Sequence, residues 1–120
     1  MKFLFVALGG GLGAVLRYMI SLIPIKMNYP ILTLCTNCLG AVLIGVVVGF
    51  ISSDKIGENQ SLFWKTGVCG GFTTFSTFSL EAVNLLESGR VAAGCSYMGL
   101  SLVLCLAGVV LGRQVSLWMQ

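Results

Sequence analysis

Residues 70–81 place two glycines, five hydroxyl side chains and three phenylalanines within one apolar stretch of the chain. The hydroxyls belong to Thr73, Thr74, Ser76, Thr77 and Ser79. A hydroxyl in hydrocarbon costs free energy unless it has a hydrogen-bond partner, so we expect this cluster to face another helix, a water-filled cavity or a permeating ligand. Phe75 and Phe78 share a helix face and add aromatic edges to the same segment. Gly70 and Gly71 together predict a break in the helix here.

Single polar side chains in the other apolar stretches extend this set. Asn37 carries an amide that needs partners for two donor hydrogens and an acceptor, so it should either bond a neighbouring helix or line a polar pathway. Tyr97 and Ser101 are four residues apart and lie on one helix face. Arg17 lies near the end of its apolar run, where it would either reach the lipid headgroups or line a vestibule that attracts anions. Glu81 follows the hydroxyl cluster as a helix-end acid.

These side chains have to be positioned by membrane-spanning helices, because the chain is too apolar for a soluble domain. Of its 120 residues 57% are hydrophobic and 9% charged, and the mean hydropathy is +0.98. Four apolar runs, each long enough to cross a hydrocarbon core of about 30 Å, cover residues 3–23, 31–51, 62–86 and 91–111. The connections are short, so consecutive helices are antiparallel neighbours in one all-α domain with a broken third helix. The first run is expected to remain in the protein rather than be removed as a signal peptide.

Lys and Arg are distributed almost evenly between the two sides of the membrane that these spans imply. One side carries Lys2, Lys55, Lys65 and Arg113, and the other carries Arg17, Lys26 and Arg90. Because the charge bias normally sets the orientation of a membrane protein, four against three predicts insertion both ways. Two oppositely inserted copies would pair as an antiparallel dual-topology homodimer, an arrangement that many transporters build as inverted repeats within one chain.

Several kinds of chemistry lack the residues they need. The chain has no His, no nucleophile beside a base and no phosphate-binding loop, so no enzyme activity is expected. The CxxC spacing at Cys35 and Cys38 lies in an apolar run with no second CxxC, so these cysteines are expected to pack between helices rather than serve redox chemistry or bind a metal. No carboxylate lies near the middle of a span, where a cation exporter would need one. Neutral hydroxyl and amide donors beside aromatic edges favour a small, strongly hydrogen-bonding anion.

Three stretches of the chain resemble the small bacterial fluoride channels of the Fluc (CrcB) family. They are GGGLGAVLRY at 9–18, NCLG at 37–40 and GGFTTFSTFS at 70–79. The similarity covers all four expected spans, and the third stretch is highly specific. It implies an antiparallel dual-topology homodimer in the bacterial inner membrane, with two pores through which cytoplasmic fluoride leaves passively.

The resemblance also implies roles for side chains along the fluoride pathway. Phe75 and Phe78 would line the pores as an aromatic box, and Asn37 would donate a hydrogen bond to the ion. The other residues that it implies are Arg17 at the vestibule and Ser76, Thr77, Tyr97 and Ser101 along a polar track.

A structural sodium ion is a further implication of the resemblance. Main-chain carbonyls of Gly70 and Thr73 would hold it at the dimer centre. The expected partners are therefore fluoride, sodium, membrane lipid and a second copy of the chain, with no nucleic acid.

Two other classes of protein stay open at this point. A small multidrug exporter shares the size and the dual topology, but its characteristic acid in the first span is absent from residues 3–23. A non-conducting membrane assembly subunit would explain the glycines but not five hydroxyls around a helix break. Ion flux in liposomes separates both classes from a channel.

Overall fold

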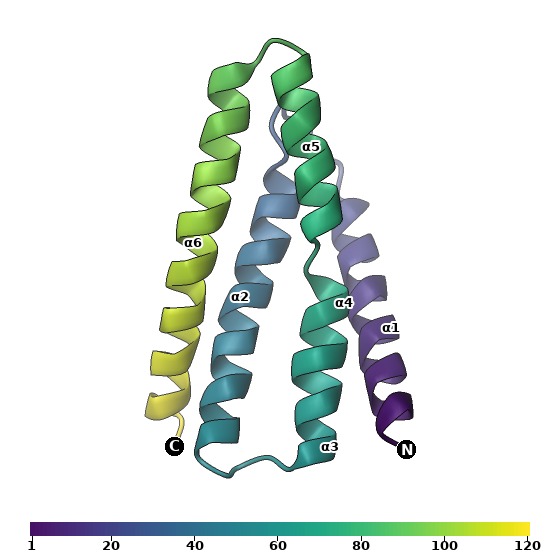
Figure 1. Cartoon of the computed structure of the whole chain (residues 1–120), viewed down its shortest axis with the longest axis vertical. Helices are drawn as coiled ribbons and strands as arrows, with labels where there is room; N and C mark the ends of the chain where they lie inside the picture. The colour runs from purple at the N-terminus through teal and green to yellow at the C-terminus, as the bar shows by residue number, and fades with distance from the viewer.

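The computed structural model describes all residues 1–120 and contains only helices and loops. The helices are α1 (Lys2–Ser21), α2 (Ile31–Ser52), α3 (Glu58–Ser61), the π-helical η1 (Leu62–Cys69), α4 (Gly70–Phe72), α5 (Phe75–Glu87) and α6 (Val91–Trp118) (Figure 1). Three of them, α1, α2 and α6, are long and apolar enough to cross a membrane. The region from α3 to α5 is also helical but is broken after α4, which confirms the predicted all-α architecture with an interrupted third segment.

The break falls at Thr73 and Thr74, so its predicted position at Gly70 and Gly71 was wrong. Gly70 has helical backbone angles (φ −64°, ψ −39°), whereas Thr73 (φ −80°, ψ 156°) and Thr74 (φ −144°, ψ 119°) are extended. Glycine permits a break but does not require one, and a cap decides where a new helix starts. The Thr74 side chain provides that cap by accepting a hydrogen bond from the amide of Thr77.

Two bounds of the predicted spans also differ from the structure. The third region begins at Glu58, where an acid in the first turn complements the positive end of the helix. The last helix continues past the predicted end at 111 to Trp118. It does so because Ser116 is fully buried beside Gly49 of α2, so this end of the chain packs within the bundle.

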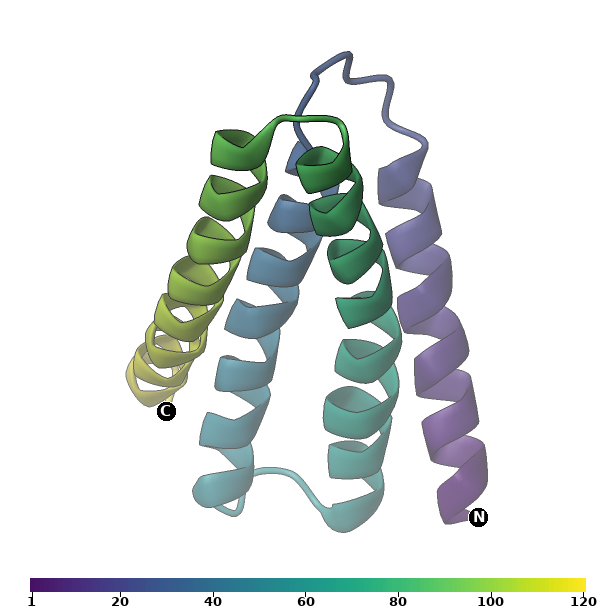
Figure 2. The ribbon, with the colours of Figure 1, turned by 45° about the horizontal axis from the view of Figure 1, so that its top comes forward.

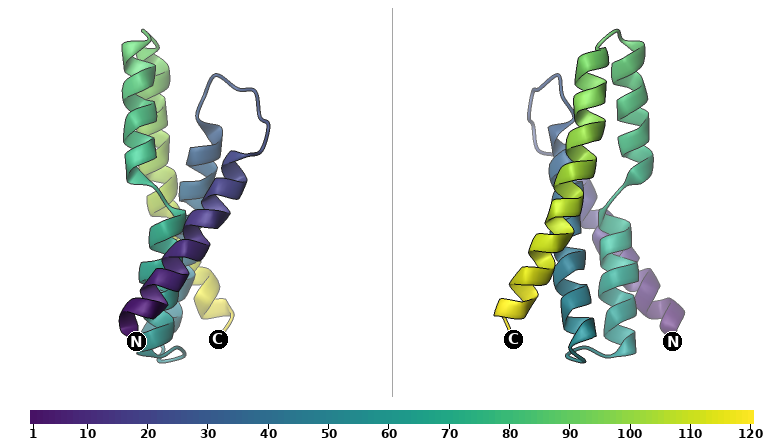
Figure 3. Two further views of the ribbon diagram at one scale, coloured as in Figure 1. Left: turned by 90° about the vertical axis from the view of Figure 1, so that its right-hand side faces the viewer. Right: turned by 60° about the vertical axis from the view of Figure 1, so that its left-hand side comes forward.

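The helices form two closely packed pairs that share one bundle. The α1 helix packs along η1 and α4, while α2 packs along α6, and α5 contacts α6 on the far side of the break. Both termini and the α2–α3 loop lie at one end, and the α5–α6 turn forms the other (Figure 1), toward which the α1–α2 loop also points (Figure 2). Viewed from the side, α5 and the first half of α6 diverge from α1 and the start of α2 (Figure 3). The break lies near the middle of the long axis of the molecule, which extends 49 Å (Figure 1).

Glycines allow the two helices of each pair to come into direct backbone contact. A Cβ added to Gly67 of η1 would lie 2.8 Å from the Cα of Gly9, and one added to Gly71 would lie 3.1 Å from the Cα of Gly10. Small residues four apart on facing helices permit this contact in membranes, where dispersion forces rather than the hydrophobic effect drive association. Gly71 is therefore used for packing against α1, which explains why the helix continues through it.

Candidate functional site

The polar centre of the molecule is the contact between Asn37 of α2 and the break in the third region. The Asn37 amide oxygen accepts a hydrogen bond from the Thr74 amide at 2.8 Å, and its amide nitrogen donates to the Thr74 carbonyl at 3.1 Å. Both backbone groups of an extended residue are thus satisfied by one side chain from another helix. The sequence left open whether Asn37 would bond a helix or line a pathway; the structure shows the bond, and a pathway role of Asn37 stays a prediction.

Most hydroxyls of the 70–81 cluster bond within their own segment. Thr73 donates to the Cys69 carbonyl at 2.8 Å, and Ser79 donates to the Phe75 carbonyl at 2.8 Å. The Ser76 and Thr74 hydroxyls are 3.4 Å apart, and Ser76 is exposed. The expectation that the whole cluster would face a helix, a cavity or a ligand holds for Thr73, which lines the hollow described below, but was wrong for Ser79, because a hydroxyl in a helix can bond the carbonyl four residues earlier.

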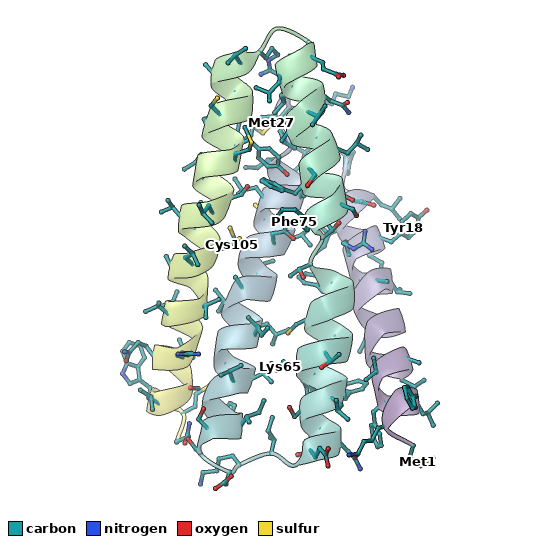
Figure 4. The ribbon with its side chains drawn as sticks, viewed as in Figure 1. Met1, Tyr18, Met27, Lys65, Phe75 and Cys105 are labelled. Atoms are coloured by element: carbon teal, nitrogen blue, oxygen red, sulfur yellow. The ribbon has the colours of Figure 1, made fainter.

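An open hollow of about 450 Å³ lies beside the break, between α2, the third region and α6. Its lining includes Asn37, Gly70, Thr73, Phe75, Phe78 and Ser101. Figure 4 shows Phe75, Lys65 and Cys105 extending toward this space from three different parts of the chain. No acidic side chain lines the hollow, and Lys65 is its one charged residue. The side chains of the hollow therefore favour an anion over a cation.

An aromatic row connects the mouth of the hollow to the core. The Phe75 and Phe78 ring centroids are 5.5 Å apart, and Phe78 lies 5.2 Å from Tyr97. Phe75 is 79% exposed, whereas Tyr97 is completely buried and also meets Tyr29 edge to face at 5.7 Å. The structure thus brings three of the predicted pathway residues into one continuous group.

Two buried hydroxyls next to this row have no hydrogen-bond partner in the protein. They are the side chains of Tyr97 and Ser101, both on α6. Buried polar groups are nearly always paired, so these hydroxyls are available to a water molecule or a bound ligand. Ser101 lines the hollow directly.

Arg17 and Thr77 lie in a different place from the other predicted residues. Both line a second, smaller cavity of about 70 Å³ together with Thr33 and Thr36 of α2. The Arg17 Nε donates to the Gly71 carbonyl at 3.2 Å, so the guanidinium fixes α1 to the third region close to the break. The predicted pathway residues consequently divide between two cavities, and Ser76 and Tyr97 line neither of them.

A hydrogen bond between Thr33 and Glu81 joins α2 to α5. The Thr33 hydroxyl donates to the Glu81 carboxylate at 2.6 Å. The sequence singled out Glu81 as a helix-end acid, whereas Thr33 was not among the predicted residues. Thr33 and Asn37 are four residues apart on α2, so a search for polar side chains that share the Asn37 face could have identified Thr33.

Two carbonyls at the break lose the donors that a continuous helix would provide. The Gly70 carbonyl would accept from the Thr74 amide, which bonds Asn37 instead. The Thr73 carbonyl would accept from the Thr77 amide, which bonds the Thr74 hydroxyl. Both residues line the hollow, and carbonyl oxygens suit hard cations. The donor set therefore fits an ion such as sodium.

Comparison with known proteins assigns the chain to a family. A family model described as "CrcB-like protein, Camphor Resistance (CrcB)" matches residues 4–113. The chain belongs to this CrcB-like family. The matched residues include the break, Asn37 and all the predicted pathway residues.

Curated relatives of this CrcB-like chain carry one name, "Fluoride-specific ion channel FluC". The relative from Ruminiclostridium cellulolyticum is 45% identical over 115 residues, which cover 92% of this chain and 88% of that protein. The relative from Clostridium perfringens is 44% identical over 117 residues (94% and 91%). The relative from Phocaeicola vulgatus is 42% identical over 119 residues (97% and 95%). With its long apolar helices, this CrcB-like chain is a multi-pass membrane protein, and in bacteria that membrane is the plasma membrane.

Proposed function

We propose that two copies of this chain form a channel through which fluoride leaves the cytoplasm passively. The hollow beside the break carries the proposal, because neutral hydrogen-bond donors and phenylalanine rings meet there without a carboxylate. The relatives named fluoride-specific ion channels support fluoride as the anion. In acid, fluoride enters a cell as neutral HF and ionises inside, so a passive anion pathway lowers its cytoplasmic concentration.

The residues of the hollow would replace the hydration shell of the ion. Asn37 uses one amide hydrogen on the Thr74 carbonyl and keeps a second one to donate. The hydroxyls of Ser101 and Tyr97, which have no protein partner, would donate as well. Phe75 and Phe78 would turn the positive edges of their rings toward the anion. All of these groups are neutral, so each binds the ion weakly enough for it to move on.

Flux through purified protein tests this function. Proteoliposomes loaded with fluoride should release it rapidly when the chain is present, and the same vesicles loaded with chloride should release little. Equal release of the two anions would contradict a fluoride-selective channel. Proton-coupled release of an organic cation would instead indicate a multidrug exporter, and the absence of any flux would indicate an assembly subunit.

A second copy of the chain would close the open side of the hollow. Phe75 is 79% exposed there, and Leu102 and Leu106 on the same wall are 64% and 61% exposed. Lipid tails would not form a selective wall on the open side of an ion pathway. An antiparallel second copy would close that side and would bring the same hydrogen-bond donors from the opposite direction. The nearly even distribution of Lys and Arg supports opposite insertion of the two copies.

The orientation of the copies can be measured with reporters fused to the C-terminus. The reporters should appear on both sides of the membrane in comparable amounts. Lysines added to the loop at 53–57 should force one orientation and remove fluoride efflux, because antiparallel pairs can no longer form. A parent chain whose reporters all lie on one side would refute the antiparallel dimer.

Sodium is proposed as a structural ion between the two copies. The Gly70 and Thr73 carbonyls of both copies would provide its ligands, which supports a hard monovalent cation at the two-fold axis. Exchanging sodium for potassium throughout purification should lower both the dimer yield and the fluoride efflux. Unchanged yield and efflux would contradict the proposal.

A further inference from the structure

The helices α2 and α6 run in the same direction and pack through small residues in a constant register (Figure 1). A Cβ added to Gly112 would lie 2.9 Å from the Cα of Gly45, and one added to Gly108 would lie 3.2 Å from the Cβ of Ala41. The two members of each pair are separated by the same number of residues along the sequence. The contact therefore continues in register along both helices.

The next pair in this register is Cys38 and Cys105, one turn above Ala41 and Gly108. Both cysteines are partly buried, and Figure 4 shows Cys105 between α6 and α2. A disulfide requires Cβ atoms about 3.5 to 4.5 Å apart. A Cβ added to Gly108 would lie 3.2 Å from the Cβ of Ala41, and the two helices diverge from there toward α5. The Cβ atoms of Cys38 and Cys105 should therefore be slightly farther apart, which suits that requirement.

We propose that Cys38 and Cys105 form a dithiol that a peroxide oxidises to an intramolecular disulfide between α2 and α6. Cys105 lines the hollow, so a small neutral oxidant such as hydrogen peroxide reaches its sulfur first. The sulfur attacks one peroxide oxygen, the O–O bond breaks, and a sulfenic acid and one water are formed. The Cys38 sulfur then displaces the hydroxyl of the sulfenic acid, which forms the S–S bond and releases a second water.

The disulfide would act on the same residues that the proposed function uses. Cys38 adjoins Asn37, whose amide holds both backbone groups of Thr74. Cys105 is part of the hollow wall, one turn below Ser101. Fixing the two helices through these positions limits the adjustments that the hollow can make for a passing ion, so oxidation lowers the flux. This effect on flux rests on the proposed function, whereas the formation of the disulfide does not.

Peroxide treatment of the purified protein tests the dithiol directly. The five free thiols should fall by two, and peptide mapping of the parent chain should recover Cys38 linked to Cys105. Cys38→Ser and Cys105→Ser should each abolish the linked pair. The matched controls Cys35→Ser and Cys95→Ser should keep it, because both cysteines are exposed outside the contact. Recovery of five thiols after treatment, or links only between chains or to Cys35, would overturn the proposal.

Fluoride efflux before and after treatment tests the consequence for transport. Oxidised parent protein should release fluoride at roughly one fifth of the untreated rate or more slowly, and dithiothreitol should restore the rate. Cys105→Ser, which lacks the sulfur that peroxide attacks, should show no response to peroxide. A mapped disulfide without a change in efflux would overturn the regulatory effect alone. A reduced parent protein that releases no fluoride would overturn the proposed function and leave the disulfide standing.

Discussion

Replacing Phe78 by isoleucine is expected to lower fluoride efflux roughly tenfold, which corresponds to a rise of about 1.4 kcal/mol in the free-energy barrier that the ion crosses. Isoleucine keeps an apolar side chain but lacks the ring whose edge carries partial positive charge. Phe75→Ile should act in the same direction, because the two rings are 5.5 Å apart and border the same hollow. Efflux is to be compared at equal amounts of folded protein, since Phe78 also contacts Tyr97.

Phe3→Ile is the matched control for Phe75→Ile. Phe3 is 90% exposed and Phe75 is 79% exposed, so both changes remove an exposed ring, but only Phe75 lies at the hollow. Phe72 is unsuitable as a control, because it is buried and a substitution there would alter packing. If both pore variants conduct like the parent while Asn37→Ala does not, the ring edges have no part in conduction and the neutral donors carry the ion alone.

Replacing Gly112 by valine is expected to prevent folding of most of the protein. A Cβ at this position would overlap the Val42 carbonyl oxygen and approach the Gly45 backbone, which cannot move aside as a flexible side chain can. Overpacking in a well-packed core typically costs about 1 to 3 kcal/mol, and a clash with the backbone of α2 places this change above that range. The yield of monodisperse protein after detergent extraction should fall at least roughly tenfold.

Gly99→Ala provides the control on the same helix. A Cβ at Gly99 would meet no atom within 4 Å, so the change adds only the better helix propensity of alanine. Its yield should equal or exceed that of the parent. If Gly112→Val and Gly99→Ala give equal yields, the α2–α6 contact does not hold the bundle together as the structure indicates.

The sequence alone was sufficient for features that depend on composition and local spacing. Mean hydropathy identified a membrane protein, and the motif at 70–79 indicated the family, which the match to residues 4–113 confirms. The orientation of the copies, the sodium ion and the roles of the pathway residues stay predictions.

Tertiary structure decided which groups meet, because their partners are far apart along the chain. The break moved from Gly70 and Gly71 to Thr73 and Thr74 because Gly71 packs on α1 and because Asn37, at a distance of 37 residues, satisfies the Thr74 backbone. No local pattern contains that information, since glycine tolerates both helix and break. The pairing of Cys38 with Cys105 likewise depends on the register of α2 against α6, which only the packing of the two helices determines.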